Sequence, residues 1–116
     1  ALGIGLGLAM NVNQRVFVIN GDGSALMSLG TMITAKSLKL TNLYHFILDN
    51  NCHESTGAQK TNSDCVDFEM LCPNTLVFKI DKDDSVPPRI TLSPKQITDR
   101  FKNALLRIQE QQETLK

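Results

Sequence analysis

The sequence has little of what marks several common classes of protein. Its three cysteines, Cys52, Cys65 and Cys72, are odd in number and show no C-x-x-C spacing, which argues against a disulfide framework and a structural zinc site. We interpret them as reduced thiols of a cytoplasmic protein. The longest apolar run, Ala1 to Met10, is too short to span a bilayer and lacks the basic flank of a signal peptide.

An excess of charge of one sign is also missing. Twelve basic and twelve acidic residues give a formal net charge of zero, and no block of like charges stands out. The sequence therefore predicts no nucleic-acid partner and no membrane partner. A neutral chain can still bind a phosphate, because a helix start and one divalent ion act locally. The 116 residues suffice for one domain, 1–116, with a modest core.

The chain opens within an apolar segment and without an initiator methionine, so we interpret it as a fragment of a longer protein. Ala1 to Met10 is predicted to be a buried helix. Neither Gly3 nor Gly5 completes a G-x-G-x-x-G/A dinucleotide motif, and no strand precedes them. We expect the glycines at 3, 5 and 7 to let this helix pack closely on a neighbouring element.

A strand, glycine turn, helix and second strand follow in that order. Val16 to Ile19 reads as a strand buried on both faces of a parallel sheet. Gly21-Asp22-Gly23 breaks it, and a helix is predicted to begin at a Ser24 cap. Leu43 to Leu48 is the second strand, which makes a βαβ unit with a right-handed crossover. The predicted apolar face of the helix consists of Leu26, Leu29, Ile33 and Leu38.

The second half of the chain is predicted to hold one more strand and one long helix. Asp49 to Asp64 reads as a polar loop, Leu76 to Ile80 as a strand, and Asp81 to Leu92 as a connection. In the last helix, Ser93 is the cap, Pro94 takes the first helical place and Gln96 completes an S-x-x-Q capping box. The apolar stripe of this helix is Ile97, Phe101, Ala104, Leu105 and Ile108. Residues 109–116 are predicted to fray.

Two short polar signatures follow successive predicted strands. The first is Gly21-Asp22-Gly23-Ser24 and the second is Asp49-Asn50-Asn51. Each alone is usually just a turn, but both fall at the sheet edge where parallel sheets bind ligands. The glycines allow close approach of a phosphate to the backbone, and the helix start faces an anion. Asp22 and Asn50 supply oxygen atoms suited to Mg²⁺.

The pair of signatures resembles the G-D-G…N-N motif of thiamine-diphosphate-dependent enzymes, with 25 residues between Gly23 and Asp49. The resemblance implies an α/β fold in three layers, a mostly parallel sheet with helices on both faces. It implies thiamine diphosphate and Mg²⁺ as cofactors. The implied metal ligands are Asp22, the Asn50 side chain and the Cys52 backbone carbonyl, with Asn51 as a register alternative to Asn50. The implied diphosphate-binding residues are Gly21, Gly23, Ser24 and Ala25.

The stretch Asn51 to Thr61 resembles the N-G-x-H-E-S-x-G-G-Q-x-T sequence of phosphonopyruvate decarboxylases and, more loosely, that of sulfopyruvate decarboxylases. This resemblance favours Asn50 as the metal ligand, because it brings the His-Glu-Ser-Thr-Gly run into register. It covers Ala1 to Phe68 well and Leu76 to Leu105 more loosely. Between Phe68 and Leu76 the family has roughly one more βα unit, so we expect either that the sheet is a strand short or that a segment is missing from this sequence.

The resemblance implies non-oxidative decarboxylation of a 2-oxo acid, with 3-phosphonopyruvate giving phosphonoacetaldehyde and CO₂. His53 and Glu54 are the candidate catalytic residues. A protonated His53 or Lys60 would suit the anionic group of a phosphonate or sulfonate. The equally supported alternative is that His53 only orders the loop and that Lys60 is exposed to solvent. His45, within a predicted strand, reads as a hydrogen-bonded structural histidine.

The family also has an upstream pyrimidine-binding domain, which is absent from this sequence. It is therefore the expected partner, from the same gene or a separate subunit, and the complete enzyme is expected to be a homo-oligomer. The chain alone is expected to be inactive. Three alternatives stay open: a sulfopyruvate decarboxylase subunit, a non-catalytic assembly or regulatory module that keeps the fold, and a plain phosphoryl-ligand domain.

Overall fold

The computed structural model describes residues 1–81 and 88–113. Contacts divide the chain into two compact units, Ala1–Lys82 and Asp83–Lys116. That the whole chain is one domain stays a prediction. Of the predicted connection Asp81 to Leu92, residues 82–87 lie outside the described part.

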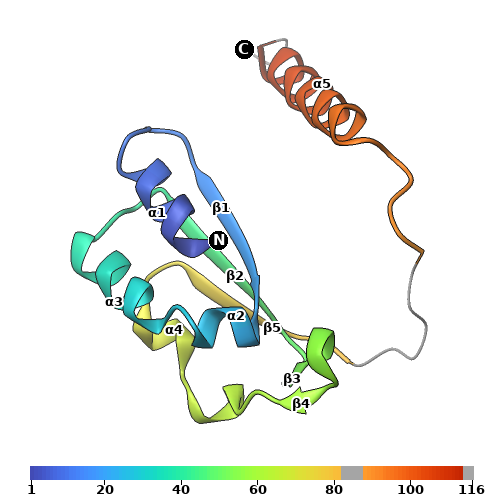
Figure 1. The fold of residues 1–116 in the computed structure, drawn as a ribbon. Coiled ribbons are helices and arrows are strands. Elements are labelled where there is room, and N and C mark those ends of the chain that lie inside the picture. Colours follow the sequence, from blue (N-terminus) through green and yellow to red (C-terminus); the bar gives the residue numbers. More distant parts are fainter. Residues whose placement is uncertain (82–87, 114–116) are drawn as a thin grey trace. The chain divides into compact units, whose positions relative to one another are not determined.

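Three parallel strands form the centre of the first unit (Figure 1). They are β1 (Val16–Gly21), β2 (Leu43–Asp49) and β5 (Thr75–Lys79), in the order β1-β2-β5. Val18 pairs with His45 across β1 and β2, and Ile47 pairs with Val77 across β2 and β5. The three predicted strands and the parallel βαβ unit are therefore confirmed.

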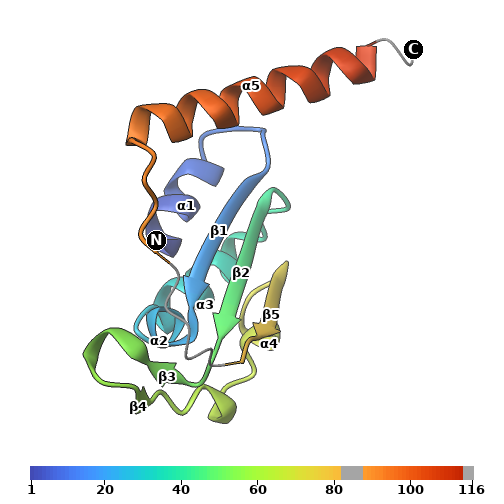
Figure 2. The same ribbon diagram turned by 90° about the vertical axis from the view of Figure 1, so that its right-hand side faces the viewer.

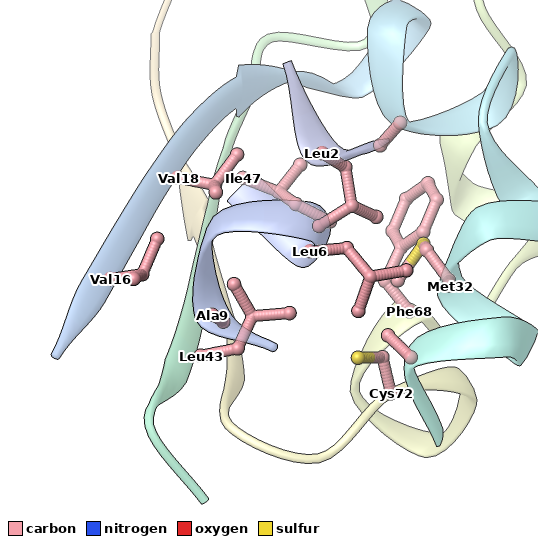
Figure 3. Close-up of a cluster of buried hydrophobic side chains, with 12 residues drawn as sticks. Leu2, Leu6, Ala9, Val16, Val18, Met32, Leu43, Ile47, Phe68 and Cys72 are labelled. Carbon is pink, nitrogen blue, oxygen red and sulfur yellow. The ribbon is translucent and has the colours of Figure 1, made fainter. Parts of the chain in front are cut away.

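Four helices cover one face of this sheet, as two perpendicular views show (Figures 1 and 2). They are α1 (Leu2–Ala9), α2 (Asp22–Leu26), α3 (Leu29–Leu38) and α4 (Phe68–Leu71). Alternate strand residues point toward them, and the core between the two layers is shown in Figure 3. The apolar core residues are Leu2, Leu6, Ala9, Val16, Val18, Ala25, Met32, Ala35, Leu43, Ile47, Phe68 and Cys72.

The opposite face of the sheet is uncovered in the unit Ala1–Lys82. On β1, Phe17 and Ile19 are 56% and 63% exposed, so the prediction that this strand is buried on both faces is wrong here. The reason is that α1 to α4 all pack on the other side, so this unit by itself has two layers. The three-layer fold stays a prediction. We call this surface the open face; it consists of Phe17, Ile19, Tyr44, Phe46, Leu48, Leu76 and Phe78.

The predicted helix at Ser24 is two helices, and Ser24 is not its cap. The first helix begins at Asp22 after an N-cap at Gly21. It ends at Leu26, where the Ser28 hydroxyl donates to the Ser24 carbonyl oxygen at 2.9 Å. A side chain that competes for helix carbonyls favours such a break.

The break also shifts the buried face of the following helix. In α3, Met32 and Ala35 are buried, whereas the predicted core residues Ile33 and Leu38 are 50% and 41% exposed. Leu26 and Leu29 of the predicted stripe do pack against the core. The stripe assumed a single continuous helix, and its phase was wrong beyond Leu29.

The predicted polar loop Asp49 to Asp64 contains short regular structure. Strands β3 (Cys52–His53) and β4 (Gln59–Lys60) pair antiparallel. Single 3₁₀ turns, η1 (Glu54–Thr56) and η2 (Ser63–Cys65), follow β3 and β4 respectively. The loop is therefore a small hairpin followed by a turn.

The passage from α4 to β5 is short, as the sequence predicted. Asp67 caps α4 by accepting from the Met70 amide at 3.0 Å. Asn74, with a positive φ of 56°, then turns the chain directly into β5.

The second unit contains α5 (Pro94–Glu113). The predicted capping box is confirmed. The backbone amide of Gln96 donates to Ser93 Oγ at 3.3 Å, and the backbone amide of Ser93 donates to Gln96 Oε1 at 2.8 Å. The helix extends past Ile108 to Glu113, so the tail predicted to fray is helical that far. Within the described residues, no helix combines the length and apolar character needed to cross a membrane.

The glycines of α1 lie in different surroundings, which gives a first prediction. A Cβ at Gly5 would collide with Val18 Cγ2, whereas one at Gly7 would meet nothing. We expect Gly5→Ala to destabilise the fold by about 1–3 kcal/mol through overpacking. Gly7→Ala should stabilise it by about 0.5–1 kcal/mol, because alanine is the better helix former. Urea unfolding of both variants checks this; equal effects would contradict close packing at Gly5 alone.

A buried histidine gives a second prediction. His45 is fully buried, and among the described residues neither ring nitrogen has a hydrogen-bond partner. It is therefore not hydrogen-bonded as predicted, and its burial is consistent with the predicted structural role. Burial lowers the pKa of His45 below its ordinary value of 6.5, because the charged imidazole is disfavoured inside the fold.

Below about pH 6.5 the unfolded chain therefore binds a proton that the folded chain does not. The free energy of unfolding should fall on acidification from pH 7.5 to 5.5, by at most about 1.4 kcal/mol per pH unit in the affected window. Urea unfolding at both pH values measures it. His45→Leu should remove this slope, and the control His53→Gln should keep it; an unchanged slope in His45→Leu would assign it to another group.

Candidate functional site

A groove of about 480 Å³ lies at the carboxyl ends of β1 and β2. Figure 2 shows α2 and β3 meeting there, at the arrowheads of the two strands. The position agrees with the rule that open parallel sheets bind ligands outside the strand ends. The groove is lined by Ile19, Asn20, Gly21, Asp22, Gly23, Ser24, Met27, Leu48, Asn50, Cys52, His53, Glu54, Ser55 and Ile80.

Asp22 is the most unusual residue of the groove, because it is only 2% exposed. The Thr61 hydroxyl donates to its Oδ2 atom. No lysine, arginine or histidine in the described ranges pairs with it. A buried carboxylate is costly unless it is paired or binds a metal ion, so this site is suited to a cation.

The loop after β2 places Asn50 and Cys52 at the same groove. Two successive side-chain turns shape it: Asp49 Oδ1 accepts from the Asn51 amide at 2.9 Å, and Asn50 Oδ1 accepts from the Cys52 amide at 3.2 Å. Asn51 has a positive φ of 58° and is not among the groove residues. Its side-chain Oδ1 lies 3.4 Å from the hydroxyl oxygens of Thr61 and Ser63.

The glycine turn is closely covered by His53. A Cβ at Gly23 would lie 2.5 Å from His53 Cε1 and Nδ1, so glycine is needed for the imidazole to pack there. Gly21 and Ser24 line the groove, whereas Ala25 is fully buried in the core. Because α2 has five residues, its dipole is smaller than that of the longer predicted helix. The amides of its first turn are still without intrahelical partners.

The two other candidates differ in position. Glu54 is exposed and lines the groove, with Oε1 lying 3.8 Å from the Cys52 sulfur. Lys60 is outside the groove and forms an ion pair with Asp64 at 3.0 Å. The hydrogen bond from Lys60 to Asp64 raises the pKa of Lys60.

Three residues near the site were not singled out as candidates in the sequence: Thr61, Ser63 and Lys79. Ser63 Oγ donates to Asp49 Oδ1 at 2.8 Å, and Lys79 Nζ lies 2.5 Å from Asp49 Oδ2. Burial alone would raise the pKa of Asp49, but the hydrogen bonds from Lys79, Ser63 and the Asn51 amide together lower it. Thr61, the last residue of the decarboxylase-like stretch, was the only one with a signal.

No cluster of three or more His, Cys, Asp or Glu side chains in the described part of the chain is arranged to hold a metal ion. The predicted ligand set is of another kind, with one carboxylate, one amide and one backbone carbonyl. Such sets are typical of Mg²⁺, which keeps several water or phosphate ligands.

Comparison with known proteins identifies a family over most of the chain. Residues 1–75 match the family described as thiamine pyrophosphate enzyme, C-terminal TPP binding domain. The phosphonopyruvate decarboxylase of Streptomyces hygroscopicus is 49% identical over 65 residues, 56% of this chain and 16% of that protein. The sulfopyruvate decarboxylase subunit beta of Methanocaldococcus jannaschii is 39% identical over 105 residues, 90% of this chain and 52% of the subunit.

A third relative, the sulfopyruvate decarboxylase subunit beta of Methanococcus maripaludis, is 33% identical, and the alignment covers 70% of that subunit. Its alignment runs over 130 residues although it includes 88% of this 116-residue chain. This relative therefore has residues within the aligned region that have no counterpart here.

Proposed function

The chain belongs to the thiamine pyrophosphate enzymes, as a C-terminal TPP-binding domain, and from this premise we propose that it supplies the magnesium and diphosphate half of the site of a 2-oxo acid decarboxylase. The observation that carries the proposal is the buried Asp22 carboxylate, which lies in the groove without a cationic partner in the described ranges. Mg²⁺ would satisfy that charge.

In this proposal the metal ligands are Asp22, the Asn50 side chain and the Cys52 backbone carbonyl. Asn50 Oδ1 accepts one hydrogen bond from the Cys52 amide and keeps a second lone pair for a metal ion. Asn50 is favoured over Asn51 because Asn50 lines the groove, whereas the Asn51 side chain contacts Thr61 and Ser63.

Gly21, Gly23, Ser24 and Ala25 are proposed to bind the diphosphate. Gly21 and Gly23 contribute no side chain of their own to the groove, although the His53 ring packs over Gly23. The first amides of α2 have no helical partner. Both features support an anion at this position. For Ala25 only the backbone amide is proposed, because its side chain is buried in the core.

Thiamine diphosphate, when bound, supplies the electron sink for loss of CO₂. This chain's part is to anchor and orient the cofactor and to bind the substrate. His53 packs against Gly23 and lines the groove, which supports a role beside the diphosphate or the substrate. Glu54 is the second candidate catalytic residue. Lys60 is a weaker candidate for an anionic substrate, since it pairs with Asp64 outside the groove.

The proposed substrate is a 2-oxo acid with a second anionic group, 3-phosphonopyruvate or 3-sulfopyruvate. The His53-Glu54 pair in the decarboxylase-like stretch favours the phosphonate. The two sulfopyruvate decarboxylase beta subunits align with 90% and 88% of this chain, which favours the sulfonate. A sulfopyruvate decarboxylase subunit would also account for a chain that works with a separate pyrimidine-binding subunit in a larger oligomer.

A non-catalytic module is the alternative of another class. It is supported by the short passage between Phe68 and Leu76 and by the three-stranded sheet. The two alternatives differ in whether the groove binds cofactor.

The test is isothermal titration of thiamine diphosphate into the chain, with and without Mg²⁺ and with and without an added pyrimidine-binding domain. Magnesium-dependent binding is the expected result. Release of CO₂ from each of the two 2-oxo acids by the reconstituted pair then identifies the substrate. If neither the chain nor the pair binds the cofactor, the non-catalytic module becomes the better account. Turnover by the chain alone would contradict the proposed need for a partner.

A further inference from the structure

A row of buried polar side chains connects the two strand ends that bear the proposed ligands. The Thr61 hydroxyl donates to Asp22 Oδ2, and the Ser63 hydroxyl donates to Asp49 Oδ1 at 2.8 Å. The two hydroxyl oxygens lie 3.4 Å apart. Lys79 Nζ completes the row, 2.5 Å from Asp49 Oδ2. We call these five residues the brace.

Four of the five brace residues are buried, so the hydrogen bonds between them are shielded from water. Asp22, Asp49, Thr61 and Ser63 are each between 2% and 7% exposed. Each hydroxyl has a single proton, and in the brace each proton is given to a different carboxylate. Buried hydrogen bonds to charged groups are stronger than neutral ones, and breaking one leaves a buried charge poorly satisfied.

The two carboxylates are satisfied differently. The Asp49 carboxylate accepts from three donors, namely the Asn51 backbone amide, the Ser63 hydroxyl and the Lys79 ammonium group. For Asp22, the Thr61 hydroxyl is the one side-chain donor among the described residues, and it contacts only Oδ2. The Thr61 bond thus fixes the orientation of the carboxylate and leaves Oδ1 without a side-chain donor.

We propose that Thr61 is a positioning residue for the divalent ion, holding Asp22 in the orientation that binds the metal. The rest of the brace, Ser63, Asp49 and Lys79, holds the loop that bears Asn50 and Cys52. This inference rests on the proposed function. Mg²⁺ requires near-ideal octahedral geometry, and groups that orient metal ligands from outside contribute about 10–100-fold to metal affinity.

The test compares Thr61→Val, which removes the hydroxyl at nearly constant shape, with Thr61→Ser, which keeps it. The measurement is the Mg²⁺ concentration for half-maximal binding of thiamine diphosphate, by titration on the full chain with the pyrimidine-binding domain present if the wild type needs it. Thr61→Val should raise this concentration about 10–100-fold, and Thr61→Ser should stay near the wild type. Thr34→Val is the matched control, because the exposed Thr34 hydroxyl only bonds the Gly30 carbonyl in α3.

Thermal unfolding without Mg²⁺ separates positioning from a purely structural role. A Thr61→Val variant that folds and keeps the wild-type Mg²⁺ requirement overturns the inference, whatever its melting temperature. If Thr61→Val does not fold, Ser63→Ala decides: a several-fold higher Mg²⁺ requirement supports the brace, and an unchanged one overturns it. A wild-type chain that binds no cofactor with its partner domain contradicts the proposed function itself, which is a different result.

Discussion

An Asp22→Asn variant is expected to lose magnesium-dependent binding of thiamine diphosphate, by at least about 100-fold in the Mg²⁺ requirement. The reason is that asparagine keeps the shape of the side chain but removes the charge that would bind the ion. Groups that only orient a ligand contribute up to about 100-fold, so a ligand itself should contribute no less. Titration of the cofactor at increasing Mg²⁺ measures the effect.

The same substitution should not lower the stability of the metal-free fold. Asp22 is buried without a cationic partner in the described ranges, and a neutral amide removes the cost of that charge. The melting temperature without Mg²⁺ is expected to stay equal or rise. Asp99→Asn on α5 is the control, since it breaks an exposed pair with Lys95 of a kind that contributes little. Loss of both binding and stability in Asp22→Asn would point to a structural role.

The second large effect is expected at the centre of the sheet. Ile47 on β2 is fully buried among the helices, so Ile47→Ala should lower the free energy of unfolding by about 2–5 kcal/mol. This is a large share of the stability of a small domain, about 5–15 kcal/mol. Urea unfolding with an unchanged denaturant slope measures it.

The neighbouring residue is the matched control for this experiment. Leu48 points to the open face and is 40% exposed, so Leu48→Ala should cost about 1 kcal/mol or less. A cost for Leu48→Ala as large as that for Ile47→Ala would contradict an uncovered face. It would then support the three-layer fold expected from the family resemblance.

Local patterns predicted the elements of the fold well, because their signals lie within a few residues. The apolar runs at Val16 to Ile19 and Leu43 to Leu48 became neighbouring parallel strands. The Ser93–Gln96 capping box is present as predicted. The predicted apolar face was wrong beyond Leu29, because the helix is interrupted at Met27 and Ser28. The Ser28 hydroxyl bonds a helix carbonyl at this break, and apolar periodicity carries no signal for such a bond.

The candidate site could be predicted only where its residues follow the strands directly. The groove brings Asp22, Asn50 and Cys52 together, as the two signatures predicted, and their roles as ligands stay proposals. Thr61 and Lys79 reach the site from positions 39 and 30 residues away from their partners. The path of the β3–β4 hairpin brings Thr61 to Asp22, whereas Lys79 meets Asp49 because the two residues are register partners in β5 and β2.

The open face has a consequence for spectroscopy. The chain has one tyrosine and no tryptophan, and that tyrosine, Tyr44, stacks on Phe17 with ring centroids 5.2 Å apart. Its intrinsic fluorescence therefore comes from a single point on this surface. Any segment or subunit that covers the face is expected to change the emission of this residue, so its binding to the chain can be followed without a label.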